Sequence, residues 1–406
     1  MRIVHVIGYF QPELGYEEYY LATEQARLGC SVAILTSDRL RRLPGLAATL
    51  RARGAPEGRR RSPGVQTVDG VTVHRLPTLF EYRDCIIVRG LRERLHALQP
   101  DVLHCWAPRQ GTPVLALLSR PPGVPAFVEM HDWQLYNPRN PLARLDFWLV
   151  RRWLYHLAFH QATGILTCAS EVARLVQQTF GVPAERLYTL PLGVDTRLFH
   201  PDPLERAAGR AALRLDPATV LLVFAGRLER SKRVDWLLEV VATARARGHD
   251  VRLLIIGSGD DDDLAELQRQ SRAAALQGAV YFQPFLPPKT LAGWYNAADL
   301  GIWPQLPSIT IREALGCGLP VVVPHGRTLQ DLTVCPGVTT FPPDDQAALV
   351  QTVLALVSQP ERLAAVRSQT AAWAAAELSY TVLARRLMAV YAEQRALVSP
   401  AFGGQA

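Results

Sequence analysis

Glycine and several cations are concentrated in one short run, Gly226–Lys232, which reads GRLERSK. The run follows a strand-like apolar stretch, 220–225, and precedes a helix-like stretch, 234–246. At such a strand-to-helix turn, backbone N–H groups and the helix dipole already favour an anion. The guanidinium of Arg227 offers a planar fork of donors, and the Lys232 ammonium is a mobile point charge. We therefore expect this turn to bind a diphosphate.

A second candidate region covers residues 299–323. A helix that begins near Ser308 would aim the N–H groups of Ile309 and Thr310 at a phosphate or a sugar. Glu313 lies one turn into that helix, and a carboxylate accepts hydrogen bonds from both hydroxyls of a ribose well. Taken alone, Glu313 could equally be a solvated helix residue. The cationic turn earlier in the chain favours the nucleotide interpretation.

Two further turns in the first half of the chain hold candidate ligand-binding residues. Gly15 lies between a strand and a helix, where a glycine lets the backbone approach a ligand closely. His131 and Asp132 follow the strand-like run 126–130 and so lie at its carboxyl end, where side chains reach a ligand. His131 could hydrogen-bond a sugar hydroxyl or help to hold a leaving group. The structural alternatives are an ordinary turn at Gly15 and a structural histidine.

Strand-like and helix-like runs alternate along the whole chain, as in parallel sheets covered by helices on both faces. The alternation breaks at residues 200–203 and then restarts, which predicts two doubly wound domains that share a cleft. Helices are expected at 17–28 and 86–97, among others. The expected strands are 3–7, 32–36, 71–76, 102–105, 126–130, 165–168, 187–190, 220–225, 251–256, 280–282, 300–303, 321–323 and 339–341.

Composition limits the possible classes of protein. The chain has 406 residues, of which 49% are apolar, so two ordinary cores are expected. No apolar run approaches the length of a membrane span, and the N-terminal run is too short for a signal peptide. We expect a cytoplasmic protein. The six cysteines show no C-x-x-C spacing and are expected to be separate reduced thiols rather than disulfides or metal ligands.

The formal net charge is +7, and two basic segments stand out. Segment 144–160 is basic and aromatic at near-helical spacing, so it could lie on an anionic membrane surface. The alternative is a solvated arginine face over an ordinary core stripe. The arginines of 39–61 are expected in a flexible loop. No nucleic-acid-binding motif accompanies the charge, so a nucleic-acid partner is not expected.

From residue 1 to about 395 the chain resembles the retaining glycosyltransferases of family four, which have the GT-B fold. This resemblance implies two Rossmann-like domains that face a central cleft, 1–197 and 198–379, with a C-terminal helix at about 380–400 that packs back on the first. The motifs that carry it occur in this order: Gly15; Asp101-Val102-Leu103-His104; His131; Gly193-Val194-Asp195; Gly226-Arg227-Leu228 with Lys232; Gly257-Ser258-Gly259; Ala298-Asp299; Glu313-Ala314; and Gly318-Leu319-Pro320-Val321-Val322.

The resemblance also implies roles for particular residues. The donor diphosphate would bind to Arg227 and Lys232, its ribose to Glu313, and its sugar near His131. The set of predicted catalytic residues is His131, Arg227 and Lys232. Donor-binding residues would be Gly15, Arg227, Lys232, Ser308, Ile309, Thr310 and Glu313. Tyr16, Glu17 and Asp132 are candidates on the acceptor side, with a helix-surface role as the alternative for Glu17. No cofactor or metal is expected.

The implied activity is transfer of a sugar from a nucleotide-diphosphate donor to a glycan or lipid-linked acceptor in the synthesis of cell-envelope polysaccharide or glycolipid. The protein would be cytoplasmic, on the inner face of the membrane if segment 144–160 binds lipid. Two alternatives stay open: a catalytically silent GT-B scaffold that binds a partner, and a nucleotide-sugar epimerase of similar fold.

The sequence departs from the family at one position. The family usually carries a Glu-x7-Glu pair, whose first glutamate touches the transferred sugar. Counting back from Glu313 reaches Gln305, and counting forward along the loop reaches Ser308, so no acidic residue occupies this place. Gln305, Ser308 or the backbone N–H groups after it would have to replace the carboxylate. The run Asp260–Asp263 invites a metal interpretation, but it opens a helix, where acidic residues favour the dipole.

Overall fold

The structure is a computed structural model, and it describes residues 1–42, 46, 50–51, 55–131, 141–146, 148, 152–305, 308–326, 329 and 331–398. The chain divides into two compact units. The first comprises Met1–Pro191 and the C-terminal segment that begins at Tyr380, and the second comprises Leu192–Ser379. Asp132 lies outside the described residues, as do parts of segment 144–160. Both units are α/β folds with parallel sheets, as the alternation of runs predicts.

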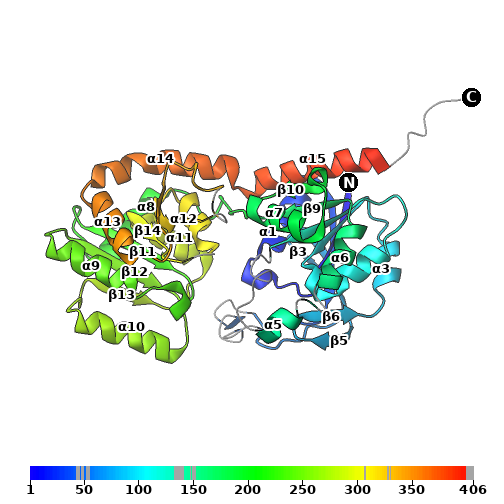
Figure 1. Cartoon of the computed structure of the whole chain (residues 1–406), viewed down its shortest axis with the longest axis horizontal. Coiled ribbons are helices and arrows are strands. Elements are labelled where there is room, and N and C mark those ends of the chain that lie inside the picture. Colours follow the sequence, from blue (N-terminus) through cyan, green and yellow to red (C-terminus); the bar gives the residue numbers. More distant parts are fainter. Residues whose placement is uncertain are drawn as a thin grey trace, which may run out of the picture. The chain divides into compact units, whose positions relative to one another are not determined.

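The first unit is built on an eight-stranded sheet in the order β10-β9-β8-β7-β1-β2-β4-β3 (Figure 1). Neighbouring strands are parallel, except that β3 pairs antiparallel with β4. The order switches direction between β1 and β7, and ligands commonly bind at the carboxyl ends of strands that flank such a switch. The strands are β1 (Arg2–Val6), β2 (Ser31–Ser37), β3 (Gly64–Val68), β4 (Val71–Leu76), β7 (Val102–Trp106), β8 (Ala126–Met130), β9 (Gly164–Thr167) and β10 (Leu187–Thr189).

Alternating side chains of these strands enter two separate cores. Val4 and Val6 belong to one core with residues of α3, α4, α6 and α7, while Ile3 lies in the other core with residues of α1 and α15. The period of two in a strand produces this division. The helices are α1 (Glu17–Arg27), α3 (Leu91–Ala97), α4 (Thr112–Leu118), α5 (Pro141–Asp146), α6 (Arg152–Gln161), α7 (Ser170–Phe180) and α15 (Tyr380–Val398).

The expected helix at 86–97 is wrong in its first half. The structure has a hairpin of β5 (Thr78–Tyr82) and β6 (Cys85–Val88), and α3 begins only at Leu91. The cause lies in the sequence, because Cys-Ile-Ile-Val is a β-branched run that favours a strand. Gly90 then adopts a left-handed conformation with φ of 75°, which separates strand from helix. The same hairpin holds arginines from the 39–61 segment, through the ion pairs Arg41–Asp84 and Arg59–Glu81.

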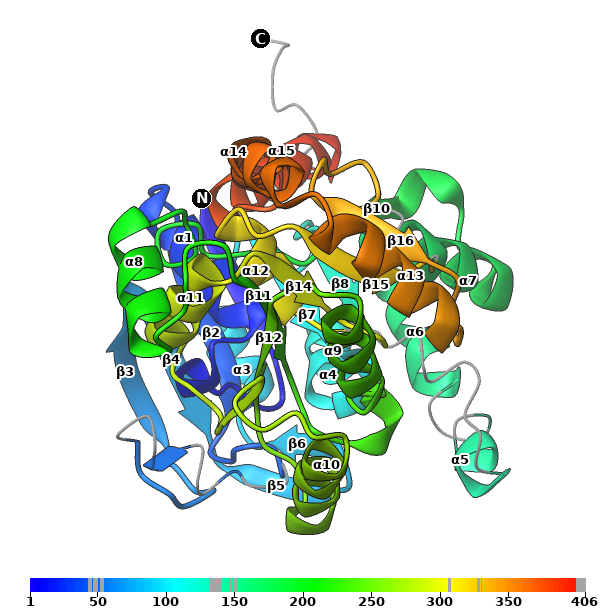
Figure 2. The ribbon, with the colours of Figure 1, turned by 90° about the vertical axis from the view of Figure 1, so that its left-hand side faces the viewer.

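The second unit has a six-stranded parallel sheet in the order β13-β12-β11-β14-β15-β16. Its strands are β11 (Val220–Ala225), β12 (Val251–Ile256), β13 (Val280–Gln283), β14 (Leu300–Ile302), β15 (Val321–Pro324) and β16 (Val338–Phe341). Helices lie on both faces of this sheet (Figure 2): α8 (Pro203–Ala212), α9 (Trp236–Ala246), α10 (Asp261–Ala273), α11 (Pro288–Ala297), α12 (Thr310–Gly316), α13 (Gln346–Val357) and α14 (Pro360–Glu377).

The order of this second sheet switches direction between β11 and β14. β12 and β13 lie on one side of β11, while β14, β15 and β16 lie on the other. Val194 and Phe199 pack in the core of this unit, and the Val194 N–H donates to the Leu378 carbonyl at 2.8 Å. The predicted domain boundary at 197 therefore lies a few residues beyond the start of the second compact unit at Leu192.

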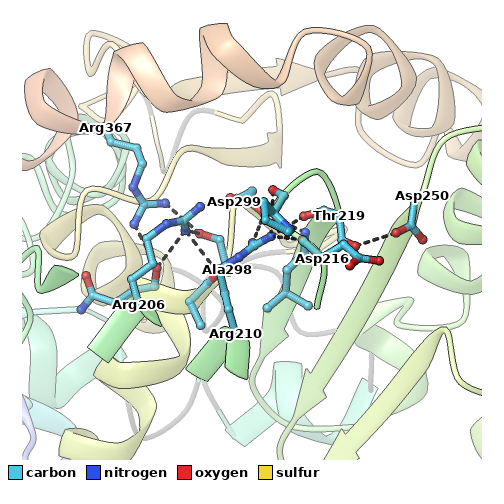
Figure 3. A network of polar contacts seen from close by, with 12 residues as sticks. Arg206, Arg210, Asp216, Thr219, Asp250, Ala298, Asp299 and Arg367 are labelled. Carbon is cyan, nitrogen blue, oxygen red and sulfur yellow. Dashed lines mark hydrogen bonds and ion pairs between the residues drawn. The ribbon is translucent and has the colours of Figure 1, made fainter. Parts of the chain in front are cut away.

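Asp299 anchors a polar network at the start of β14 (Figure 3). Its two carboxylate oxygens lie 2.5 Å from Arg206 Nη2 and 2.9 Å from Arg210 Nη1, and the Leu221 N–H donates to Oδ2 at 2.8 Å. Arg206 also donates to the last carbonyls of α11, and Arg367 donates to the Ala298 carbonyl at 2.8 Å. The network therefore ties α8, α11, α14 and the amino ends of β11 and β14 together, away from the carboxyl ends where ligands bind.

Candidate functional site

The cationic turn follows β11 directly and lies against the turn that follows β12. The Leu228 N–H donates to the Ser258 carbonyl at 3.1 Å. The approach is so close that a Cβ on Gly257 would meet the Gly226 carbonyl oxygen at 1.8 Å, and one on Gly259 would meet the Leu228 carbonyl oxygen at 2.1 Å. Only glycine therefore fits at these two positions, and the pair of turns fixes the backbone that carries Arg227.

Two cations of this turn are neighbours. Arg227 is exposed, and Lys232, in the short 3-10 helix Arg230–Lys232, is half-buried. Burial lowers the pKa of the Lys232 ammonium, Glu229 counteracts this shift, and the nearby Arg227 adds to it. Like charges held together repel each other, so a bound anion would relieve an unfavourable interaction in the free protein. This is the electrostatic character that a diphosphate site requires.

The start of α12 is fastened to the end of β11, next to the cationic turn. Thr310 Oγ1 donates to the Ala225 carbonyl at 2.8 Å and accepts from Trp303 Nε1 at 3.0 Å. Ser308 Oγ lies 2.5 Å from the same Thr310 oxygen. Because Ala225 immediately precedes Gly226, the structure brings Ser308 and Thr310 to the carboxyl end of the strand that carries the predicted diphosphate turn.

Glu313 lies on α12 and is half-buried. Burial raises the pKa of the Tyr295 hydroxyl well above its ordinary value, and the charge of Glu313 raises it further, which places the carboxylate near that ring. Gln305, the first candidate to replace the missing family glutamate, donates from Nε2 to Asp344 at 2.8 Å. The Ser308 hydroxyl is engaged with Thr310, whereas Ile309 is 40% exposed. The replacement by backbone N–H groups near Ile309 stays a prediction.

In the first unit, His131 follows β8 and meets two carboxylates. Its Nε2 lies 2.7 Å from Glu129 Oε1 and 3.3 Å from Glu17 Oε2, and only 32% of its side chain is exposed. Glu129 is a buried residue of β8, and Glu17 begins α1, which follows the turn of Gly15. The structure therefore brings together His131 and Glu17, two predicted site residues that are far apart in the sequence.

Charge dominates the behaviour of this cluster. Burial alone would lower the pKa of His131, whereas Glu17 and Glu129 raise it well above the ordinary 6.5. Burial alone would raise the pKa of Glu129, but its contacts with His104 and His131 lower it to about 2. For Glu18, burial raises the pKa to about 7. The pairing is that of an imidazolium held between carboxylates.

Glu17, Glu129 and His131 also bring one potential ligand atom each within 4.8 Å of one another, a spacing that a cation can use. The proton on the imidazole already accounts for the short contacts, so we assign no metal to them. Within the described residues, the aspartate run 260–263 does not form such a group. Asp260 precedes α10 as its N-cap residue, and Asp263 pairs with Arg230 at 3.2 Å. The helix-start interpretation of this run is therefore consistent with the structure.

Around Gly15 the backbone turns as a glycine allows. Gly15 has a left-handed φ of 64° and ends a short 3-10 helix, and Tyr16 is the N-cap residue of α1 with 42% of its surface exposed. A Cβ on Gly15 would meet the Tyr20 hydroxyl at 2.9 Å. The predicted roles of Gly15 in donor binding and of Tyr16 on the acceptor side remain predictions.

Sequence reasoning missed Glu129 as a member of the site. A signal was present, because a glutamate within a five-residue buried strand, Ala126–Met130, needs a partner. His104 belongs to a motif that the sequence analysis noted, but no role was given to it. Both residues contact the predicted site from behind, inside the sheet.

Comparison with known proteins agrees with this geometry. Residues 15–193 match the family model described as glycosyl transferase 4-like domain, and residues 219–359 match the model described as glycosyl transferases group 1. The described fold has two doubly wound units with candidate groups at the carboxyl ends of their strands, and this is the architecture of a GT-B glycosyltransferase. The chain belongs to the group 1, family-four glycosyltransferases.

Individual relatives are more distant. D-inositol 3-phosphate glycosyltransferase 1 of Catenulispora acidiphila is 31% identical over 56% of the chain and 56% of its own length. The matched part thus spans about half the length of that relative. Among solved structures, sucrose-phosphate synthase from Thermosynechococcus elongatus aligns over 98% of the chain and 100% of its own, with a TM-score of 0.71 and 20% identity. HepE of Anabaena in complex with UDP covers 97% and 100%, with a TM-score of 0.70 and 15% identity.

Proposed function

We propose that the protein is a retaining glycosyltransferase that moves a sugar from a nucleotide-diphosphate donor to a neutral glycan or lipid-linked acceptor, as in the synthesis of cell-envelope polysaccharide or glycolipid. The observation that carries the proposal is the pair Arg227 and Lys232. These cations lie together after β11, at the switch point of the second sheet. Glu313, on the helix tied to the same strand end, would bind the ribose hydroxyls.

The mechanism follows from where charge develops. As the sugar leaves, negative charge grows on the departing diphosphate, and Arg227 and Lys232 stabilise it because they are already in place. We propose that these side chains perform this task without a metal ion. His131 and Glu17 of the first unit would hydrogen-bond hydroxyls of a sugar. We assign no protein nucleophile, so the retaining outcome is proposed to come from attack on the face that the diphosphate leaves.

A neutral acceptor is favoured by the charges near the start of α1. Glu17 and Glu18 lie beside His131, so this side of the first unit carries more carboxylates than cations. A phosphorylated acceptor, such as the one in the name of the Catenulispora relative, would be repelled there unless another cation binds its phosphate. We therefore place the neutral glycan or lipid-linked acceptor first and the inositol phosphate second.

A panel of nucleotide sugars tests the donor half of the proposal. UDP-, GDP- and ADP-sugars are incubated with the protein, and binding is measured by calorimetry and sugar release by chromatography. We expect one nucleotide to bind and its sugar to be released slowly without acceptor and with retention of anomeric configuration. Release that persists in excess EDTA is expected if no metal takes part. Failure of a folded protein to bind any donor would favour the silent scaffold, and an altered sugar still attached to its nucleotide would favour the epimerase.

We also propose that the first unit touches an anionic membrane. Within the described residues no helix is long and apolar enough to cross a bilayer. Two segments of the first unit, the β5–β6 hairpin and α5, lie at the same lower end of it in both views (Figures 1 and 2). Arginines at 144 and 152 are exposed near the second segment. The large exposed apolar side chains are Leu79, Phe80, Tyr82, Leu142, Leu145, Trp148 and Trp153.

Vesicle binding tests this contact. Trp153 is 72% exposed, and insertion of its ring into the headgroup region would contribute to binding. We expect the protein to sediment with vesicles that contain phosphatidylglycerol but not with pure phosphatidylcholine, and the Trp153→Ser variant to bind roughly tenfold more weakly. Leu204→Ser is the matched control, because Leu204 is 83% exposed on α8 of the second unit. Equal binding of wild type and Trp153→Ser would contradict the assignment of this surface.

A further inference from the structure

A chain of buried polar groups runs behind His131, inside the first unit. Glu129 Oε2 lies 2.8 Å from His104 Nε2, and His104 Nδ1 lies 2.6 Å from the Tyr391 hydroxyl. His104 and Tyr391 are fully buried and Glu129 is 2% exposed, although polar side chains are costly in a core unless they are paired. The groups come from β7, β8 and α15, on the sheet face that α1 and α15 cover.

The distances select one arrangement of protons. If the Tyr391 hydroxyl donates to Nδ1 of His104, the proton of this neutral ring lies on Nε2 and faces Glu129. The opposite tautomer would turn a lone pair toward the carboxylate, which is unfavourable. Glu129 then accepts from His104 at one oxygen and from Nε2 of His131 at the other. Both oxygens of the carboxylate are thereby held in place.

A neighbouring histidine is fixed in the same way and stays out of the exchange. Trp106 Nε1 donates to His5 Nδ1 at 3.0 Å, and His5 Nε2 lies 2.7 Å from Gln25 Oε1. Burial, together with nearby His104, lowers the pKa of His5 to about 3, so this ring stays neutral. The Trp106 ring stacks on His104 at 4.5 Å and meets His131 edge-on at 6.2 Å. These aromatic contacts confine both rings that contact Glu129.

We propose that Glu129 is a positioning residue of the proposed transferase site, which orients the His131 ring and keeps the proton on Nε2, so that Nδ1 is the nitrogen presented to a bound sugar. His104 and Tyr391 hold Glu129 from behind. Among the described residues, both polar partners recorded for His131 meet its Nε2. This inference rests on the proposed function for its consequence in catalysis, but its structural content concerns the protein alone.

The prediction concerns the titration of His131. The groups that face this ring are Glu129 from β8, Glu17 and Glu18 from α1, Cys168 after β9 and the Trp106 ring from β7. In Glu129→Gln one of the two carboxylates at Nε2 loses its charge while burial persists. We expect the midpoint of His131 to fall by about one unit or more. It is measured by NMR on ring-labelled histidine, with His131→Asn to assign the signal among the ten histidines.

The same variant has a kinetic signature. The alkaline limb of the kcat profile should move to lower pH together with the NMR midpoint, and kcat at pH 8 should fall at least tenfold, while KM for the donor changes little. Glu24→Gln is the matched control, since Glu24 is another buried carboxylate of α1, paired with Arg27 and Thr381 and not with His131. Its His131 midpoint and its pH profile should match those of the wild type.

The outcomes separate this inference from the proposed function. A folded Glu129→Gln protein with an unmoved His131 midpoint overturns the positioning role, whether or not transfer is observed. A shifted midpoint in a protein that uses no nucleotide sugar supports the positioning of His131 and rejects the transferase. If Glu129→Gln does not fold, Tyr391→Phe decides, because it removes only a hydroxyl 2.6 Å from His104. We expect a smaller downward shift there, and no shift would overturn the chain of contacts.

Discussion

Replacing Arg227 or Lys232 by alanine should lower kcat for sugar transfer by about a hundredfold or more. Each substitution removes a cation whose proposed partner is the charge that develops on the departing diphosphate, so the transition state loses more than the bound donor does. We therefore expect kcat to fall further than KM for the donor rises. Initial rates over a range of donor concentrations, together with calorimetric binding of the nucleotide, separate the two effects.

The matched control for these variants is Arg230→Ala. Arg230 lies in the same short 3-10 helix as Lys232, but its side chain is 86% exposed and pairs with Asp263. Removing it changes the net charge of the protein by the same amount, and we expect its kcat to stay within about threefold of the wild type, as for an exposed ion pair. If Arg227→Ala and Lys232→Ala behaved like this control, the diphosphate would have to bind elsewhere.

The largest loss of stability should come from Asp299→Asn. The side chain of Asp299 is 17% exposed and contacts the guanidinium groups of Arg206 and Arg210, with Arg367 close to both arginines. An asparagine has nearly the same shape, but it leaves these partly buried cations without their carboxylate. We expect the free energy of unfolding to fall by about 3 kcal/mol. The midpoint of thermal unfolding should drop by about 6–12 °C in calorimetry.

Asp263→Asn serves as the control for that loss. The Asp263 carboxylate also pairs with an arginine, but that arginine is largely exposed, and such pairs contribute about 0–1 kcal/mol. A small effect in this control and a large one in Asp299→Asn would show that burial and the number of partners determine the loss. Equal, small effects would mean that the arginines of the network find water instead. Nucleotide binding to the folded Asp299→Asn protein should persist, because the network lies at the amino ends of the strands.

The parallel strands were predictable because they are buried on both faces. Their sequences are continuous apolar runs, and the expected bounds of 71–76, 126–130, 220–225 and 251–256 agree with the observed strands. The cationic turn was recognisable for a related reason, since glycine and charge interrupt the chain where β11 ends. The hairpin of β5 and β6 was not recognised, because short exposed strands with mixed polarity lack a strong period.

The site in the first unit was only partly predictable. Position after a strand identified His131, but its two carboxylate partners depend on how β8 and α1 pack, which no local pattern encodes. Glu129 and His104 are separated by several turns of chain and meet only because β7 and β8 are paired in register. Tyr391 contacts His104 across 287 residues, and such a contact comes from tertiary packing alone.

The packing of α15 sets the order in which the protein can be completed on the ribosome. Leu383, Leu387 and Tyr391 of α15 fill the core on one face of the first sheet, whose strands are made long before this helix. Synthesis of the 287 residues between His104 and Tyr391 takes about 15 to 60 s at bacterial rates. During that interval the first sheet is without one of its covering helices and exposes apolar surface, whereas the second unit can close its core unaided. The first unit to emerge is therefore the last to finish folding, and it is the one that would need a chaperone.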